Sequence, residues 1–306
     1  MIKFQKVQKE FTIGSIKVGG QPGELPTVLI GTIFYEGHKI VKDPMKGDFN
    51  KERAEELIKR QEELSELTGN PHMTDIVGLS EKSIIKYIDF VADVTDAPFL
   101  IDSAAMHVKI AALKYVAETG LLGRTVYNSI SVYVKEEELK AIRESGLKAA
   151  IILAHNPTNV WPEGRIKLLK GNKKERGLLD RALKEANIEK PLIDVSVLDV
   201  PSIGLAVETI KLVKDFFGLP SGAAPLNAVL EWRRVNDYGK IAKKACAAGS
   251  LITVQMGGAD FIFYGPIRHA EVVFPVCAMT DAIIAYRAMR HGIRPKVKNH
   301  PLYKIF

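Results

Sequence analysis

The sequence predicts an α/β protein built as a (β/α)8 barrel with an N-terminal β-hairpin. Short apolar runs rich in β-branched residues alternate eight times with segments of helical periodicity. Several of these runs end abruptly in a polar residue, as at Asp102, Asn128 and Asp194. A doubly wound open sheet is the competing arrangement, and a chain of 306 residues fits either one as one domain. We expect a single domain over residues 1–306, with 1–24 as a hairpin extension.

The first part of the chain supplies the hairpin and three strand–helix units. Residues 11–18 are predicted to form two short strands around a Gly14-Ser15 turn. Asn50 and Ser80 are good N-caps for the first two helices, and Gly69 is a natural end for the first. The predicted strands are 27–34, 74–77 and 98–101, and the third helix is 106–118.

The rest of the chain continues the same alternation. Strands are predicted at 125–127, 149–154, 191–195, 218–222 and 260–264, of which 218–222 has the weakest pattern. Helices are predicted at 136–144, 178–186, 205–217, 227–248 and 270–290. Residues 156–176 are predicted to be a long basic loop.

Composition and charge argue against several classes of protein. The net charge of +7 comes from scattered lysines and arginines without a nucleic-acid-binding motif, so no nucleic-acid partner is expected. Cys246 and Cys277 lack metal-ligand spacing, which argues against a disulfide framework and a zinc site. No uninterrupted apolar run reaches the roughly 18 residues of a membrane span, and the first residues lack the apolar core of a secretory signal. We therefore expect a cytoplasmic protein.

Polar residues gather at the predicted carboxyl ends of the strands, the face that carries the active site in such barrels. Each one alone is more often a helix cap or a turn residue. Three Asp or Asn residues that follow apolar runs directly are harder to explain in that way, because a carboxylate there must be hydrated, paired or bound to a ligand. The set is Asp75, Asp102, Asn128, His155, Asn156, Asp194, Ser221 and Tyr264.

Recognition of a cyclic amidine or guanidine edge, such as that of a pterin, is the chemistry this set suits. A carboxylate accepts an exocyclic amine and a ring N–H together, and an Asn amide both donates and accepts. Metal ligation by Asp102 and Asp194 is the alternative. It is weakened because no His-x-His, His-Glu-x-x-His or Asp-x-Asp motif accompanies them.

These same residues carry a resemblance to a known family. The motifs are Val18-Gly-Gly-Gln-Pro-Gly-Glu24, Ala97-Pro-Phe-Leu-Ile-Asp-Ser103, Val126-Tyr-Asn-Ser-Ile130, Phe263-Tyr-Gly-Pro266 and His300-Pro-Leu-Tyr-Lys-Ile-Phe306. On these motifs the chain resembles, nearly end to end, the H subunit of tetrahydromethanopterin S-methyltransferase. It is more similar still to that subunit's corrinoid-dependent relatives, such as the methylcobalamin:tetrahydrofolate methyltransferase of glycine betaine demethylation.

The resemblance implies a pterin-binding barrel like dihydropteroate synthase. It implies transfer of a methyl group between nitrogen 5 of a reduced pterin, tetrahydromethanopterin or tetrahydrofolate, and the cobalt of a corrinoid protein. By motif match, Asp102, Asn128 and Asp194 hold the pterin, with Asp75 and Ser221 as further candidates. The distant folate enzymes place an Asn straight after strand seven. This chain departs from that pattern, and Asn227 is the nearest residue for nitrogen 5, so the catalytic candidates are Asn227 and Asp102.

The corrinoid is expected on a separate partner protein, because the chain lacks an Asp-x-His-x-x-Gly run that would supply an axial histidine. Tyr35, His38, Trp161 and Arg165 are the candidates for docking that partner, and a solvated loop is an equally good explanation for them. No metal is expected to be bound directly. A homodimer is expected by family analogy alone.

Two other functions stay open from the sequence. A condensing enzyme of the dihydropteroate synthase kind would share the fold, use loop Lys and Arg residues for pyrophosphate and leave Asn227 dispensable. A non-catalytic subunit that binds a corrinoid protein would show no pterin affinity.

Overall fold

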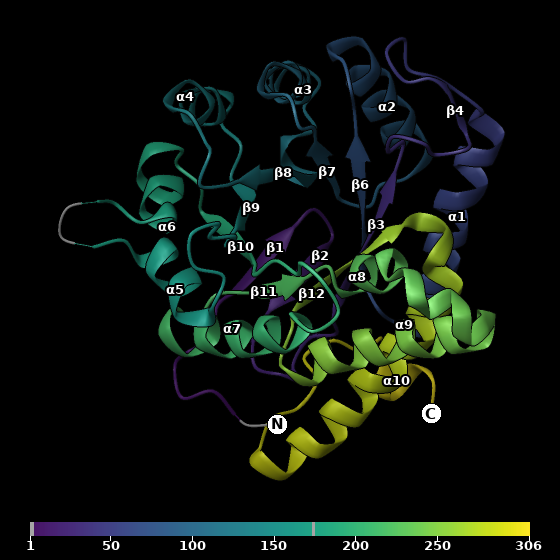
Figure 1. Ribbon diagram of the computed structural model, residues 1–306, viewed down its shortest axis with the longest axis vertical. Coiled ribbons are helices and arrows are strands. Elements are labelled where there is room, and N and C mark those ends of the chain that lie inside the picture. The colour runs from purple at the N-terminus through teal and green to yellow at the C-terminus, as the bar shows by residue number, and fades with distance from the viewer. Residues whose placement is uncertain (1–2, 173–174) are drawn as a thin grey trace.

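Eight parallel strands close into a barrel in the computed structural model, which describes residues 3–172 and 175–306 (Figure 1). The strands run around the barrel in chain order as β3, β6, β7, β8, β9, β10, β11 and β12, and β12 pairs with β3. The predicted (β/α)8 barrel is therefore confirmed over the open sheet. A separate antiparallel pair, Glu10–Ile13 (β1) and Ile16–Gly19 (β2), is the predicted hairpin.

The barrel strands and their connecting helices have the following bounds. The strands are Val28–Ile33 (β3), His72–Val77 (β6), Phe99–Asp102 (β7), Thr125–Ile130 (β8), Ala149–Leu153 (β9), Lys190–Asp194 (β10), Ser221–Ala223 (β11) and Phe261–Pro266 (β12). A small pair, Val41–Asp43 (β4) and Asp48–Phe49 (β5), lies in the connection after β3. The helices are Lys51–Thr68 (α1), Glu81–Val94 (α2), Met106–Glu118 (α3), Glu136–Ser145 (α4), Pro162–Lys170 (α5), Leu178–Asp180 (α6), Ile203–Phe216 (α7), Pro225–Glu231 (α8), Gly239–Met256 (α9), Ala270–Ala288 (α10) and Pro301–Lys304 (α11).

Helix boundaries follow the capping chemistry of the sequence. The Asn50 side chain accepts a hydrogen bond from the Arg53 backbone N–H at the start of α1, and Gly69 ends that helix in the left-handed conformation. Ser80 and Ser83 form a reciprocal capping box at the start of α2. The caps predicted from the sequence therefore begin both helices and end the first.

Two predicted segments have a different helix content in the structure. Residues 156–176 contain helix α5. Pro162 begins this helix at a position where its missing N–H costs nothing, and the helix ends at Gly171. Residues 173–174 of that predicted loop lie outside the described residues. The predicted helix 227–248 is divided into α8, a 3-10 turn at Arg233–Tyr238 and α9.

The interior of the barrel is a packed apolar core. Alternate residues of each strand point inward, and the hairpin adds Ile13 and Val18 beside them. The hairpin therefore closes the end of the barrel at which the strands begin, and we call the opposite end, where the strands finish, the mouth. The inward-facing strand residues are Val28, Ile30, Met73, Leu100, Val126, Ala149, Ile151, Leu192, Phe261 and Phe263.

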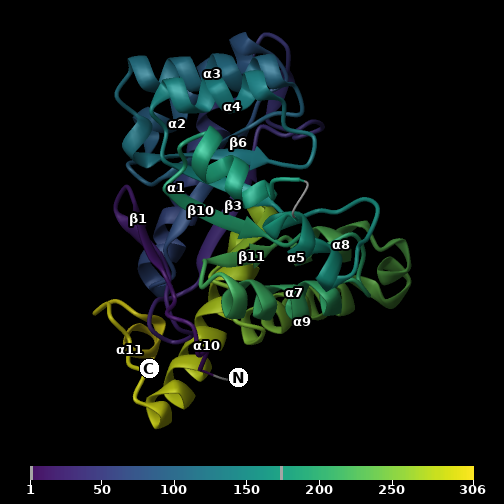
Figure 2. The same cartoon turned by 90° about the vertical axis from the view of Figure 1, so that its left-hand side faces the viewer.

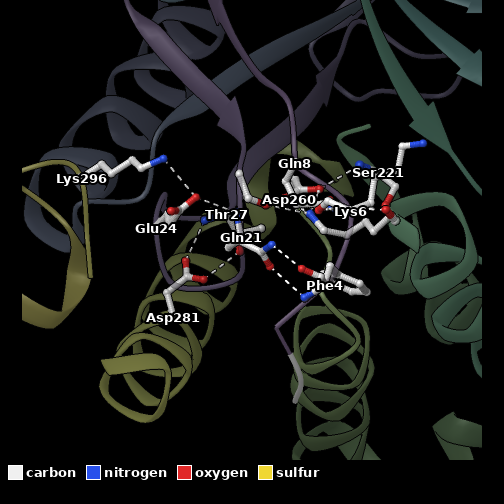
Figure 3. A network of polar contacts seen from close by, with 12 residues as sticks. Phe4, Lys6, Gln8, Gln21, Glu24, Thr27, Ser221, Asp260, Asp281 and Lys296 are labelled. Atoms are coloured by element: carbon white, nitrogen blue, oxygen red, sulfur yellow. Dashed lines mark hydrogen bonds and ion pairs between the residues drawn. The ribbon is translucent and has the colours of Figure 1, made fainter. Parts of the chain in front are cut away.

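The base of the barrel, where strands begin, carries a buried polar network (Figure 3). The ammonium group of Lys214, on α7, lies 2.6 and 2.7 Å from the two carboxylate oxygens of Asp260 and also donates to the Gly20 carbonyl. Asp281, on α10, accepts from the Thr27 N–H and hydroxyl and from the Asn70 amide. These contacts tie the N-terminal segment and α10 to the barrel.

Helix α10 lies at the end of the molecule where both chain termini lie (Figure 2). The segment Ile267–His291, which contains it, is long and apolar enough to cross a membrane by length and composition alone. However, 56% of its most apolar window is buried inside the protein, and α10 packs against α1, α9 and α11. Such burial is typical of a core helix in a barrel.

Candidate active site at the barrel mouth

The inward-facing rows of the barrel change from apolar to polar at the carboxyl ends of five strands. Two residues beyond each inward-facing apolar residue, the side chain points inward again. Leu100 is followed in this way by Asp102, Val126 by Asn128 and Leu192 by Asp194. On β3 and β6, Thr32 and Asp75 occupy the equivalent positions. The sequence pattern and the barrel geometry therefore bring these five side chains together at the mouth.

Asp102 and Asn128 are neighbours in register on β7 and β8, and both are partly exposed. Asn128 donates from its Nδ2 to Asp75 Oδ1 over 3.1 Å. Asp75 lies deeper, and its Oδ2 accepts from the Thr32 hydroxyl over 3.0 Å. The side-chain oxygens of Asp102 and Asn128 therefore remain available to a ligand at the mouth.

Asp194 reaches the mouth from β10, two strands beyond Asn128. Its Oδ1 accepts one hydrogen bond from the Ser196 backbone N–H over 2.8 Å. Burial raises the pKa of Asp194 to about 6, and the Ser196 hydrogen bond and the charge of Arg165 oppose that rise. The carboxylate is thus held in place while lacking the ion pair that would satisfy it fully.

Desolvation dominates the electrostatics of the other two acids. Burial raises the pKa of Asp75 to about 6, against the hydrogen bonds from Asn128 and Thr32. Burial, and next the charge of Asp75, hold the pKa of Asp102 well above its usual range, while Lys109 lowers it. Carboxyl groups in this state gain from a ligand that brings N–H donors.

A buried ion pair supports β8 from behind. Lys109, on α3, lies 2.8 Å from the Glu138 carboxylate on α4, and the Tyr127 hydroxyl donates to the same carboxylate. The Lys109 ammonium also lies over the Tyr127 ring and 3.4 Å from the Ser129 carbonyl. Sequence reasoning missed this group. The available signal was a lysine on the buried face of a helix, beside Val108 and Ala112.

Asn227 also lies at the mouth, at the start of α8. Its Oδ1 is so close to Gly265 that a Cβ at position 265 would lie 2.2 Å from it. Gly265 has a φ of +65° and continues the inward-facing row of Phe261 and Phe263 on β12. A glycine here permits both the left-handed backbone and the approach of the Asn227 amide. The exposed Asn227 side chain thus stands over the end of β12.

Ser221 does not belong to this group. It begins β11, and its backbone N–H donates to Asp260 at the base of the barrel (Figure 3). Its register partner is Ile193, an outward-facing residue, so its side chain points away from the barrel interior. The prediction that Ser221 binds the ligand was wrong because β11 begins later than the sequence suggested.

Two of the four docking candidates are also corrected. Arg165 is 1% exposed, and its guanidinium donates to the carbonyls of Val160, Val195 and Ser196. His38 is buried, and its Nδ1 accepts from the Phe34 N–H. Burial and then the charge of Arg268 lower the pKa of His38 to about 4. Both side chains hold loops in place and offer nothing to a docking protein.

The other two candidates remain accessible. Trp161 is 61% exposed at the start of α5. Tyr35 is partly exposed, its ring stacks on His38, and its hydroxyl accepts from Arg268 over 2.7 Å. Their role in docking stays a prediction.

The described residues hold no group of three or more His, Cys, Asp or Glu side chains arranged to bind a metal ion. The alternative interpretation of Asp102 and Asp194 as metal ligands gains no support from this geometry.

Solved structures with a similar fold define the fold class of the chain. A dihydropteroate synthase of Yersinia pestis with a pterin–sulfa conjugate matches 90% of this chain and 99% of its own, with a TM-score of 0.60 and 12% identity. The dihydropteroate synthase of Thermus thermophilus matches with a TM-score of 0.59 and 13% identity, over 90% and 100% of the two chains. The chain is thus a dihydropteroate-synthase-like barrel.

Sequence comparison narrows the class to a family. The family described as "Tetrahydromethanopterin S-methyltransferase MtrH subunit" matches residues 6–296, and the chain belongs to it. The H subunit of that enzyme from Methanothermobacter thermautotrophicus is 43% identical over the full length of both chains. The H subunit from Methanopyrus kandleri is 45% identical over 97% of both. The H subunit of a putative mtx methyltransferase from Methanosarcina mazei is 43% identical over 99% of both.

Proposed function

We propose that this chain transfers a methyl group between nitrogen 5 of a reduced pterin, bound at the mouth, and the cobalt of a corrinoid that a separate protein carries. The chain's membership in a methyltransferase family supports the reaction type. The observation that carries the site is the convergence of Asp102, Asn128 and Asp194 at inward-facing positions of three strands.

The three side chains offer hydrogen-bond acceptors. The cations that act on the two acids, Lys109 and Arg165, form their hydrogen bonds with other groups. The 2-amino group and ring N–H groups of a reduced pterin supply the matching donors. A carboxylate that accepts two of them forms charge-assisted bonds, which are the stronger kind. The hydrogen bonds from the ligand also compensate for the free-energy cost of desolvating Asp102 and Asp194.

Methyl transfer is an in-line displacement, so the protein acts mainly by positioning the reactants and stabilising charge. The three acceptors fix the pterin plane. We assign to Asn227, which lies at the start of α8 beside Gly265, the hydrogen bond to nitrogen 5 as the charge of that nitrogen changes; the closeness of its amide to Gly265 at the end of β12 supports this assignment. A bond that strengthens as charge develops accelerates the reaction selectively.

The names of the relatives favour tetrahydromethanopterin over tetrahydrofolate as the pterin. The sequence motifs favour the demethylation branch, in which a methylated corrinoid protein donates the methyl group and the pterin accepts it. The relatives are subunits of larger enzymes, so a corrinoid-protein partner is expected at the mouth, near Trp161 and Tyr35. A homodimer and a cytoplasmic location complete the proposal.

A methyl-transfer assay tests this function. Purified chain is mixed with methylcobalamin and either tetrahydromethanopterin or tetrahydrofolate, and methylated pterin is measured together with the loss of methylcobalamin absorbance. Formation of methyl-tetrahydromethanopterin, lost in Asn227→Ala, would support the proposal. Binding of pterin without methyl transfer in either direction would favour the condensing enzyme. Absence of pterin binding would favour the non-catalytic subunit.

A further inference from the structure

Asp75 differs from the other acids of the mouth in its depth. It lies two residues before the end of β6, is 3% exposed and pairs in register with Thr32 and Leu100. Both of its carboxylate oxygens accept hydrogen bonds from other side chains, Oδ1 from Asn128 and Oδ2 from Thr32. A group so placed acts on its neighbours and has little surface for a ligand.

The first neighbour is Asn128. Because a carboxylate only accepts hydrogen bonds, Asp75 holds the NH₂ end of the Asn128 amide inward. The amide oxygen then points the other way, toward the mouth. Asp75 thereby favours the amide orientation in which the Asn128 oxygen is free to accept a hydrogen bond from a ligand.

The second neighbour is Asp102, the last residue of β7 and the register partner of Asn128. The charged and titratable groups around it are Asp75 on β6, Lys109 on α3, and Tyr127 on β8 with Glu138 on α4. Lys109 is committed to Glu138 at 2.8 Å, so the negative charge of Asp75 is only partly offset. The Asp75 carboxylate reaches Asn128, the register partner of Asp102, so both acids lie beside the same amide side chain. Neighbouring buried carboxyl groups favour the protonated form of one of them.

We propose that Asp75 is a positioning residue that keeps a proton on Asp102 while the site is empty, and that pterin binding expels this proton. The inference rests on the proposed function. The proton leaves the Asp102 carboxyl for the solvent, and the freed carboxylate accepts N–H groups of the pterin. Of the two acids, Asp75 is the one that stays ionised at neutral pH, because two side-chain donors satisfy its carboxylate.

The proposal sets the sign of the pH dependence. At pH values at which Asp102 is protonated in the empty site, pterin affinity rises with pH, approaching tenfold per pH unit. Above the titration of Asp102 in the empty site, the affinity becomes independent of pH. Replacing Asp75 with Asn removes the charge that holds the proton and keeps the shape, so the dependence shifts to lower pH.

Titration calorimetry tests this linkage. Tetrahydromethanopterin is titrated into the wild type, Asp75→Asn and the exposed charge control Glu63→Gln, in buffers of different ionisation enthalpy from pH 6 to 8. We expect the wild type and the control to release up to one proton per pterin, and Asp75→Asn to release clearly less. Above pH 7, Asp194, with its pKa of about 6, contributes little to the count.

A second measurement does not depend on the variant. Infrared difference spectra of chain labelled with ¹³C-aspartate should lose a protonated-carboxyl band when pterin binds. Tight binding without buffer-dependent heat, or equal proton release by Asp75→Asn, would overturn the inference and leave the proposed function intact. Failure of the wild type to bind any tetrahydropterin would contradict both the inference and the proposed function.

Discussion

The two ends of the barrel both bury carboxylates, and they treat them differently. At the base, Asp260 is paired with Lys214 and also accepts from the Ser221 N–H, and Asp281 accepts from Thr27 and Asn70. At the mouth, Asp194 accepts one protein hydrogen bond, from Ser196. The two carboxylates of the base are paired within the protein, whereas those of the mouth keep free acceptor oxygens.

This difference separates a structural role from a functional one among residues of the same chemical type. A fully paired buried acid contributes to a specific fold, and its loss is felt as lost stability. An acid with unused acceptors carries a desolvation cost that a ligand can relieve. Substitutions at the two ends should therefore change different measurements.

The largest expected effect is at the base. Replacing Lys214 with Met leaves the Asp260 carboxylate buried without its partner, and should lower the free energy of unfolding by about 3–5 kcal/mol. Lys296→Met is the matched control, because Lys296 forms a half-exposed pair with Glu24 and should cost about 1 kcal/mol or less. Denaturant unfolding measures both. Equal costs would mean that the base pair is no more important than a surface pair.

At the mouth, Asn227→Ala should lower kcat by roughly 100-fold or more, with little change in pterin affinity or stability, because the lost bond acts on developing charge. Gly265→Ala should act in the same direction, since its Cβ would meet the Asn227 amide. Gly292→Ala is the control. It has a similar φ of +75° and no heavy atom within 4 Å of an added Cβ. Steady-state kinetics measures kcat. An equal fall in kcat in both glycine variants would assign the effect to backbone strain.

Asp102→Asn and Asp194→Asn should each weaken pterin binding by roughly 10–100-fold, because a charge-assisted bond is replaced by a neutral one. Their melting temperatures should stay the same or rise, since Asp194→Asn removes a desolvated charge and Asp102→Asn replaces a carboxyl group that is protonated in the empty site. Calorimetry and thermal unfolding on the same samples measure both properties. A fall in melting temperature with unchanged affinity would mean that these acids have a structural role, like those at the base of the barrel.

The last expected effect is a change in the pH dependence of stability. Burial raises the folded-state pKa of Asp194 from 3.8 to about 6. Its contribution to stability is therefore present below about pH 4 and is lost as the pH rises through 6, a change of at most about 3 kcal/mol. Unfolding of the wild type and Asp194→Asn at pH 4, 5, 6 and 7 should show this difference, and exposed Asp237→Asn should not. Parallel curves for wild type and Asp194→Asn would contradict it.

The mouth could be predicted from the sequence more fully than the base. Asp102, Asn128 and Asp194 each follow an apolar strand, so local pattern and fold class were enough to bring them together. Ser221 and Arg165 were misplaced because β11 spans three residues and a helix occupies the predicted basic loop. Lys109 and Lys214 escaped notice because their partners, Glu138 and Asp260, lie 29 and 46 residues further along the chain. Such pairing depends on tertiary packing, which local periodicity does not contain.

The proposed function depends on hydrogen bonds from the amino-substituted edge of the pterin to the acceptors at the mouth. The most direct measurement is a binding cycle between wild type and Asp102→Asn, each titrated with a tetrahydropterin and with its analogue that lacks the 2-amino group. We predict that the wild type prefers the amino form by at least tenfold and that Asp102→Asn loses most of this preference. An equal preference in both proteins would contradict the account.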